Sequence, residues 1–363
     1  EVPHPHRYRV IHQMEQLESQ GIHCDDVFYI DLSMEQVRYY TTFIFYRCPY
    51  TDVIGAFIQE AKNQNKTVLY DVDDLVIDTM YTDTIPYIQT LNDDDRRLYD
   101  SGVVRMGRTL KLCDAAITTT ERLQTELQRY VPEVIVNRNV ASEEMVQCSE
   151  IANEQYKTGT LTVNVKNKKV ELSVDPNRVY IGYFSGSITH NADFNIVVPA
   201  LRRLMQENEN VFLKVVGELE LPDELADLKD RIVNLPFVDY RELPKLIRSV
   251  DINIAPIEDT IFNEAKSENK WMEAALVYVP TVASNVGAFE QCIDPDKNGI
   301  LCENTEEDWY QALAILVHDQ TRRIQIGQCA HQHIYESYIT TKTGRNLASY
   351  IEKVRAKTAA IVL

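Results

Sequence analysis

One stretch of sequence decides the fold, namely Phe262-Asn263-Glu264-Ala265-Lys266-Ser267-Glu268-Asn269-Lys270-Trp271-Met272-Glu273-Ala274-Ala275-Leu276-Val277-Tyr278-Val279-Pro280-Thr281-Val282-Ala283-Ser284. It predicts a polar loop, a helix and a buried strand in direct succession. Ser267 is a typical N-cap residue, and apolar residues recur after it at helical spacing. Pro280 then precedes a short run of residues that favour a strand.

The start of this predicted helix has the composition of an anion site. Free backbone N–H groups and the positive end of the helix dipole attract phosphate, and Lys266 and Lys270 add two ammonium groups. Glu273, one turn beyond Lys270, adds a carboxylate suited to ribose hydroxyls. An ordinary capped amphipathic helix with a Lys270–Glu273 ion pair explains the same residues, so the context has to decide.

The context favours a ligand site. A predicted strand at 251–255 ends at Pro256, so the lysine loop leaves the carboxyl end of a strand, where open α/β sheets hold their ligands. A second predicted strand, 179–184, is followed by Ser185-Gly186-Ser187-Ile188-Thr189-His190. Gly186 allows a close backbone approach, and the hydroxyls of this loop can donate to phosphate oxygens. His190 alone is more typical of an ordinary surface histidine.

The rest of the chain repeats the same alternation of strands and helices. Such alternation is typical of parallel sheets with helical crossovers, so we expect an α/β protein with two doubly wound domains. The first half has predicted strands at 42–46, 67–71, 114–118 and 134–136, with helices at 10–20, 53–64 and 120–130. The second half has predicted strands at 179–184, 212–217, 232–235, 251–255, 280–283 and 299–302, and the tail from 321 to 360 is mostly helical.

The segment 145–178 is polar and separates the two halves. Residues 160–165 and 169–174 alternate apolar and polar side chains with period two around a polar turn, which predicts an inserted β-hairpin. Because a doubly wound domain usually begins with a strand, we expect the first strand of the first domain to be missing from this chain. The hairpin itself is more typical of an ornamental surface feature than of a dedicated binding site.

These motifs together resemble the donor segment of nucleotide-sugar glycosyltransferases of the GT-B fold, particularly the retaining glycosyltransferase family 4. Glu273 stands seven residues before Pro280, as the second glutamate of that family's Glu-x7-Glu motif does. The first glutamate falls at Ala265 in this chain, and the neighbouring carboxylates are Glu264 and Glu268. The loop after 179–184 is similar to the variant subset that reads Ser-Gly-Ser-x-Thr-His.

The resemblance implies two Rossmann-like domains that face a central cleft. It places an acceptor-binding domain at 1–144, the linker with its hairpin at 145–178, a donor-binding domain at 179–335 and a helix returning to the first domain at 336–363. The diphosphate of the donor needs stabilisation as negative charge develops on it, which is the catalytic role expected of Lys266 and Lys270. The expected donor-binding residues are Ser185, Gly186, Ser187, His190, Gly217, Val238, Pro256, Glu264, Lys266, Ser267, Lys270 and Glu273.

The first domain carries the expected acceptor residues, which are Arg7, Arg9, Asp73 and Asp74. In a retaining enzyme the departing phosphate takes the acceptor's proton, whereas an inverting enzyme needs Asp73 or Asp74 as general base. The carboxylates from Asp71 to Asp78 also suggest a metal site, but the resemblance implies a transferase without a metal. The basic residues of 96–111 are expected on a helix pair, where a solvated face is favoured over a site for an acceptor diphosphate.

Composition excludes several classes of protein. The 363-residue chain has a net charge of −18, which argues against general nucleic-acid binding. Seven cysteines show no metal spacing and suggest reduced thiols, so we expect a cytoplasmic protein, with the inner face of the membrane as an alternative location. No apolar run is long enough to span a bilayer. A dehydrogenase is disfavoured because no Gly-x-Gly-x-x-Gly follows a strand.

The expected activity is transfer of a sugar from a nucleotide diphosphate donor to a carbohydrate acceptor in cell-surface glycan assembly, with retention. No cofactor is expected besides the nucleotide-sugar co-substrate, for which a UDP-sugar is preferred over a GDP- or dTDP-sugar. Expected partners are a glycan or lipid-linked glycan acceptor and further domains of the same polypeptide, with no nucleic acid. The alternative is a catalytically inactive GT-B-like subunit that binds a partner transferase, and the alanine at position 265 is the reason to keep it.

Overall fold

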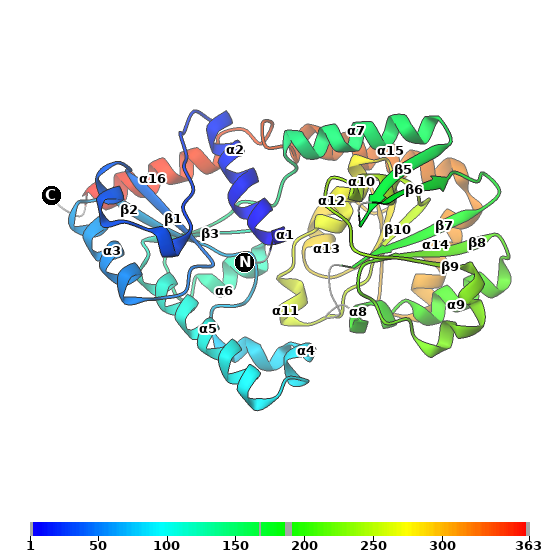
Figure 1. The fold of residues 1–363 in the computed structure, drawn as a ribbon, viewed down its shortest axis with the longest axis horizontal. Coiled ribbons are helices and arrows are strands. Elements are labelled where there is room, and N and C mark those ends of the chain that lie inside the picture. Colours follow the sequence, from blue (N-terminus) through cyan, green and yellow to red (C-terminus); the bar gives the residue numbers. More distant parts are fainter. Residues whose placement is uncertain (1–2, 167, 186–190, 361–363) are drawn as a thin grey trace. The chain divides into compact units, whose positions relative to one another are not determined.

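The computed structural model describes residues 3–166, 168–185 and 191–360. These form two compact units, which we call unit 1 and unit 2 (Figure 1). Unit 1 comprises 1–140, 260–267 and 340–363, and unit 2 comprises 141–259 and 268–339. Within the described residues, no helix is both long and apolar enough to cross a bilayer.

Unit 1 is built on a parallel sheet of four strands that are neighbours in sequence order, β1 (Thr42–Tyr46), β2 (Thr67–Asp71), β3 (Ala115–Thr118) and β4 (Val134–Val136). Buried Phe57 and Leu110 lie in the core on one face, and buried Leu17, Leu347 and Ile351 cover the other. The remaining elements are α1 (Pro3–His6), the π-helix η1 (Arg7–Ile11), α2 (His12–Ser19), η2 (Tyr29–Asp31), η3 (Met34–Arg38), α3 (Asp52–Asn63), η4 (Thr79–Thr84), α4 (Pro86–Gln89), α5 (Asp93–Leu112), α6 (Glu121–Leu127), α11 (Ile261–Glu264) and α16 (Asn346–Ala360).

Unit 2 is a doubly wound domain with a six-stranded parallel sheet in the order β12-β11-β10-β7-β8-β9. The strands are β7 (Val179–Phe184), β8 (Val211–Val216), β9 (Ile232–Leu235), β10 (Ile252–Ala255), β11 (Thr281–Ser284) and β12 (Ile300–Cys302). The strand order reverses between β7 and β10, and ligands of open α/β sheets bind at the carboxyl ends of the strands at such a switch point.

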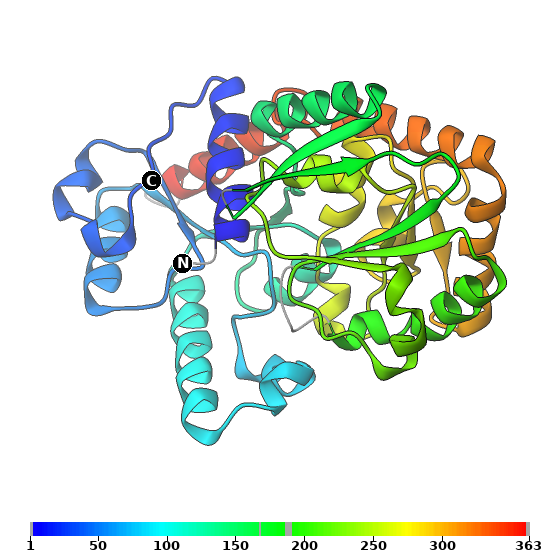
Figure 2. The ribbon, with the colours of Figure 1, turned by 45° about the vertical axis from the view of Figure 1, so that its right-hand side comes forward.

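Helices cover both faces of this sheet (Figure 2). Trp309 and Leu201 belong to the core on one face, and Leu246 and Ala274 to the core on the other. The helical elements are α7 (Glu143–Lys157), α8 (Asn191–Asn195), α9 (Val198–Glu207), η6 (Asp223–Arg231), α10 (Leu243–Arg248), α12 (Asn269–Leu276), α13 (Ala288–Cys292), α14 (Glu306–His318) and α15 (Gln320–Ser337).

The predicted hairpin is confirmed as an antiparallel pair, β5 (Thr160–Val165) and β6 (Lys168–Ser173). The predicted strands of both sheets are also confirmed, with ends that shift by one residue at most. One expectation about helices is wrong, because residues 96–111 lie on the single helix α5 and not on a helix pair. The polar segment before the hairpin, for which no element was predicted, folds as α7, whose first turn is capped by the hydroxyl of Ser142.

Candidate functional site

Two strand ends meet backbone to backbone at the switch point of unit 2. Ser185 follows β7, is 4% exposed, and donates its N–H to the carbonyl of Val216 over 2.9 Å. Gly217 follows β8 with φ +108°, and a Cβ at this position would lie 1.8 Å from the carbonyl oxygen of Ser185. Only glycine fits there, because both the left-handed backbone and the close approach exclude a side chain. The result is a close backbone contact between the two strand ends, in which Ser185 is buried and Gly217 is half-buried.

The other side of the switch point is fixed by hydrogen bonds around the end of β10. The N–H of Ile257, which follows Pro256, donates to Ser284 Oγ over 2.9 Å, and its carbonyl accepts from Asn304 Nδ2 over 2.9 Å. Glu258 N–H donates to the buried carboxylate of Asp193 over 2.9 Å. These bonds hold the loop after β10 in one conformation and so make a rigid floor.

Helix α12 brings a lysine against the strand that leads into the switch point. The ammonium of Lys270 lies 4.5 Å from the centre of the Tyr183 ring on β7, two residues before Ser185. A cation held over a tyrosine face in partly buried surroundings is stabilised electrostatically. Asn253 Nδ2 also donates to the Lys270 carbonyl over 3.1 Å, which ties the helix to β10. Glu273 is half-buried on the same helix.

Ser267 is not the N-cap of this helix. Helix α12 starts at Asn269, and its N-cap residue is Glu268, which is 1% exposed and accepts a hydrogen bond from the Tyr338 hydroxyl over 3.0 Å. The Ser267 hydroxyl instead accepts from Asn139 Nδ2 over 3.0 Å. Ser267 is therefore held by unit 1, as are Glu264 and Lys266, whereas Lys270 and Glu273 belong to unit 2.

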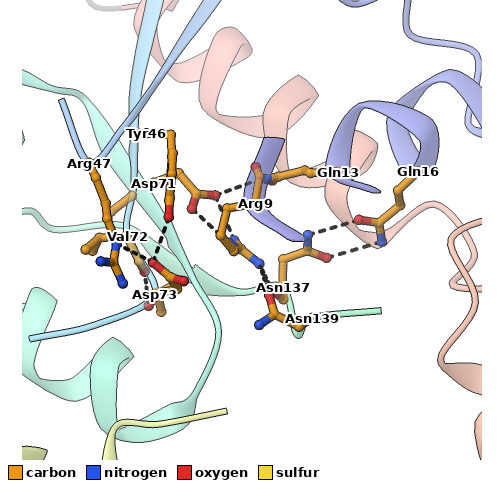
Figure 3. Close-up of polar contacts among 12 residues, drawn as sticks. Arg9, Gln13, Gln16, Tyr46, Arg47, Asp71, Val72, Asp73, Asn137 and Asn139 are labelled. Carbon is orange, nitrogen blue, oxygen red and sulfur yellow. Dashed lines mark hydrogen bonds and ion pairs between the residues drawn. The ribbon is translucent and has the colours of Figure 1, made fainter. Parts of the chain in front are cut away.

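Buried charge fills the carboxyl end of β2 in unit 1 (Figure 3). Arg9 donates to both carboxylate oxygens of Asp71 over 2.9 and 2.7 Å, and Gln13 adds a third bond of 2.8 Å. Arg9 also donates to the Asn137 carbonyl over 2.7 Å and to Asn139 Oδ1 over 3.2 Å. Burial raises the pKa of Asp71 to about 6, and the Arg9 guanidinium limits that rise.

The expectation that Arg9 binds an acceptor is therefore wrong. Its side chain is 1% exposed, and its guanidinium is used inside unit 1. Arg9 lies on the π-helix η1, which turns the buried side chains of Arg7, Tyr8 and Arg9 inward. Arg7 is 9% exposed and its guanidinium lies 5.3 Å from the Tyr8 ring.

Asp73 and Asp74 lie beside this ion pair and are held by Arg47, which the sequence did not single out. Arg47 Nε lies 2.6 Å from Asp73, and its NH2 group lies 3.5 Å from Asp74. Figure 3 shows the Tyr46 hydroxyl on the same Asp73 carboxylate, at 3.3 Å. Arg47 has φ +40°, a left-handed conformation that costs energy in a residue with a side chain. The available signal was a basic residue directly after an apolar strand.

Lys266 joins this cluster electrostatically. Burial raises the pKa of Asp74, with Asp73 adding to the rise, while Arg47 and Lys266 oppose it. Glu264 is directed elsewhere, because its carboxylate lies 2.6 Å from the guanidinium of Arg122 on α6. Ala265, at the position of the family's first glutamate, is fully buried in the core of unit 1.

The other predicted donor residues fall in three places. Gly186, Ser187 and His190 lie outside the described residues. Val238 is buried in the core beside the sheet of unit 2, and the preceding Phe237 is exposed. Among the described residues, no three His, Cys, Asp or Glu side chains are placed to hold a metal ion. A cavity of about 310 Å³ in unit 2, lined by Cys292, Cys329 and His333 among others, contains none of the predicted site residues.

Comparisons with known proteins give a family match to part of the chain and a fold match to most of it. Residues 179–319 match the family model described as glycosyl transferases group 1. No curated protein sequence matches the chain. A glycosyltransferase from Rickettsia africae superposes with a TM-score of 0.61 at 13% identity, covering 95% of this chain and 93% of that one.

Two further solved structures share the fold at 13% identity. Anabaena HepE in complex with UDP and glucose gives a TM-score of 0.57, covering 90% of this chain and 80% of that one. WaaG, a glycosyltransferase involved in lipopolysaccharide biosynthesis, gives a TM-score of 0.53, covering 84% of this chain and 81% of that one. All three likenesses span both units of the chain, so the fold is GT-B.

Proposed function

We propose that this chain, a glycosyltransferase of the GT-B fold whose residues 179–319 belong to glycosyl transferases group 1, transfers a sugar from a nucleoside diphosphate donor to a carbohydrate acceptor. The observation that carries the proposal is the switch point of unit 2. There, glycine-permitted backbone at Ser185 and Gly217 stands next to β7, and β7 carries the ring under the Lys270 ammonium. The N–H groups of Ser185 and Gly217 are bonded within the sheet, so the glycine turn supplies close approach and the Lys270 ammonium supplies the positive charge that a diphosphate requires.

The chemistry follows from charge development on the leaving diphosphate. Lys270 and Lys266 are the ammonium groups that we propose for stabilising that charge. Glu273 would accept hydrogen bonds from ribose hydroxyls. We propose retention of the anomeric configuration, in which the departing phosphate takes the acceptor's proton. In the inverting alternative, Asp74 would be the general base, since burial raises its pKa towards the range useful for proton transfer.

We propose UDP as the nucleotide and a cell-surface or lipid-linked glycan as the acceptor, with peripheral placement at the inner face of the membrane. Support for the nucleotide comes from HepE, which was solved with UDP and glucose. Support for the acceptor comes from WaaG, which is involved in lipopolysaccharide biosynthesis. The carboxylates Asp73 and Asp74, braced by Arg47, offer hydrogen-bond acceptors for the hydroxyls of such a glycan.

One observation favours the inactive-subunit alternative. Ala265 replaces the glutamate that would touch the sugar, and the adjacent Glu264 carboxylate is paired with Arg122. A subunit that only supports a partner transferase has no need of either group.

The test is thermal unfolding of the wild type, Lys270→Met and Lys297→Ala in the presence of UDP, GDP, dTDP, CMP or NAD. Lys297 is a matched control, because it is an exposed lysine of unit 2 that pairs with Asp294 over 3.0 Å. We expect UDP to raise the melting temperature of the wild type and Lys297→Ala, and to lose this effect in Lys270→Met. If no diphosphate shifts the wild type, the active-transferase proposal fails and the inactive-subunit alternative gains.

A further inference from the structure

The β5–β6 hairpin of unit 2 has two edges, and the β5 edge is sealed. The backbone N–H of Thr162 donates to the side chain of Gln155 on α7 over 3.1 Å. The N–H of Asn164 donates to the carboxylate of Glu242, the residue before α10, over 2.9 Å. Side chains from the underlying helices therefore satisfy the outward backbone donors of this strand, as proteins commonly do to protect sheet edges.

The β6 edge carries no such seal within the described part of the chain, where β6 pairs with β5 alone. Val174 donates its N–H to the Gly159 carbonyl, so the even-numbered residues of β6 bond to β5. The N–H and C=O groups of Lys169, Glu171 and Ser173 consequently point outward. The side chains of the same three residues are exposed, whereas Val170 and Leu172 pack against the core of unit 2.

The charges on this edge are complementary to themselves. When β6 pairs antiparallel with a second β6 about Val170, each Lys169 stands opposite Glu171 of the other strand. Directly opposed unlike charges stabilise a cross-strand pair, and like charges destabilise it. Each Lys169–Glu171 pair would also exchange two backbone hydrogen bonds, because the outward groups belong to these odd-numbered residues.

The neighbouring registers of this pairing place like charges opposite each other. A shift that centres the pairing on residue 169 opposes two lysines, and one that centres it on 171 opposes two glutamates. Lysines on an edge strand normally discourage pairing, and among pairings made within β6 only the register about Val170 places a carboxylate opposite Lys169. The pattern thus permits one symmetric arrangement and disfavours its alternatives.

We propose that β6 is the interface of a symmetric homodimer, in which two hairpins join edge to edge into one four-stranded antiparallel sheet. The two-fold axis passes beside Val170, so the interface is made of the same surface on both copies. Strand addition of this kind draws its affinity from main-chain hydrogen bonds and its specificity from side chains. The contact is small, so the dimer is expected to dissociate on dilution.

The test is sedimentation velocity of the full chain over a wide concentration range, with charge-reversal variants. Lys169→Glu and Glu171→Lys each place like charges opposite one another at both symmetric positions. Each is expected to weaken the dimer by about tenfold or more. The double variant Lys169→Glu/Glu171→Lys restores both unlike pairs and should dimerise like the wild type. An equimolar mixture of the two single variants should form a heterodimer.

A variant that removes one backbone donor tests the main-chain hydrogen bonds separately from the charges. Lys169→Pro removes an N–H that points away from β5, so it should leave the hairpin intact while weakening the dimer. Circular dichroism and melting temperature check that each variant remains folded. A wild type that stays monomeric at every concentration overturns the proposal. So does a wild-type dimer that the single charge reversals leave unchanged, since another surface, or another protein strand, would then be the partner.

Discussion

The two sheets of this chain differ at their carboxyl ends. In unit 1 the end of β2 is occupied by a buried ion pair. Asp71 is the last residue of β2, and its partner Arg9 comes from the helix η1, which precedes the sheet in the chain. In unit 2 the ends of β7 and β8 meet through backbone at Ser185 and Gly217. Unit 2 has buried charge too, at Asp193, which binds the loop after β10, and within a strand at Lys214 of β8, whose ammonium donates to the carbonyl and hydroxyl of Ser249 at the end of α10.

The difference shows that a place at the carboxyl edge is not enough to make a binding residue. A polar side chain there is available to substrate only when no internal partner already uses it, and a buried ion pair is expensive to break. Asp71 and Arg9 lie at the carboxyl edge of the sheet, but each is already the hydrogen-bond partner of the other. At the unit 2 edge the N–H groups of Ser185 and Gly217 are bonded to Val216 and Leu235, so what distinguishes this edge is the close backbone packing that Gly217 permits and the absence of a buried ion pair among the residues described there.

The largest expected effect comes from breaking the ion pair of unit 1. Arg9→Met leaves the Asp71 carboxylate buried without its cation, and we expect the unfolding free energy of unit 1 to fall by about 3–5 kcal/mol. Hydrogen exchange of residues 67–71 and 211–216 measures this in each sheet separately. Protection of 67–71 should fall, while that of 211–216 should stay unchanged.

The double variant Arg9→Met/Asp71→Leu is the control for this effect. Removal of both charges should recover much of the lost stability, because no unpaired charge remains. Equal exchange in both sheets after Arg9→Met would contradict the structural role of the pair, as would a loss below about 1 kcal/mol.

The next effect breaks the open edge of unit 2. Gly217→Ala forces a side chain into left-handed backbone and against the Ser185 carbonyl 1.8 Å away. Overpacking of about 1–3 kcal/mol and a left-handed cost of about 1–2 kcal/mol suggest a loss of about 2–5 kcal/mol. The UDP-induced rise in melting temperature should also vanish. Gly102→Ala is the control, since a Cβ at that position meets no atom within 4 Å. A normal UDP-induced rise in melting temperature in Gly217→Ala would argue against this edge as the donor site.

The third effect concerns the buried cation of unit 2. Burial lowers the pKa of Lys214 from 10.5 to about 8, and Asp251 opposes the shift. Between pH 8 and 10.5 the unfolded chain keeps a proton that the folded chain has released, so stability rises with pH across this window. The gain is roughly 2–3 kcal/mol. Urea unfolding of wild type and Lys214→Met at pH 7.5 and 10 measures it, and equal pH dependence in both would refute the shift.

Sequence patterns were sufficient for the elements of both sheets but not for the use of their side chains. Short apolar runs between helical segments predicted the parallel strands, because a strand that is buried on both faces is apolar at nearly every position. The hairpin followed from period-two alternation in 160–165 and 169–174. The switch point required the spatial strand order, yet Ser185, Gly217 and Pro256 could be placed near it because Ser185 and Pro256 directly follow predicted strands and Gly217 ends one.

The failures arose where a long-range partner overrides local chemistry. Nothing near Arg9 in the sequence shows that Asp71, 62 residues away, holds it. Ser267 is a good N-cap by residue type, but its hydroxyl accepts a hydrogen bond from Asn139. Glu268 is the N-cap residue of α12 instead. Arg47 was overlooked because its left-handed backbone, which the structure shows at φ +40°, has no sequence signature in an arginine.

The smallest effect tests whether loop 260–267 is anchored to unit 1 through this same hydroxyl. Ser267→Ala removes the acceptor of a 3.0 Å bond from Asn139 Nδ2, whose amide oxygen still accepts from Arg9. The loss should be about 0.5–1.5 kcal/mol, confined to the loop, because one hydrogen bond between the loop and Asn139 is removed. Hydrogen exchange of 260–267 should quicken while 67–71 stays protected. Ser337→Ala, which removes an exposed hydroxyl bonded to its own helix, is the control. Unchanged exchange in the loop would show that Arg122–Glu264 and the buried Ala265 hold it without Ser267, which would confine the role of Ser267 to ligand contact.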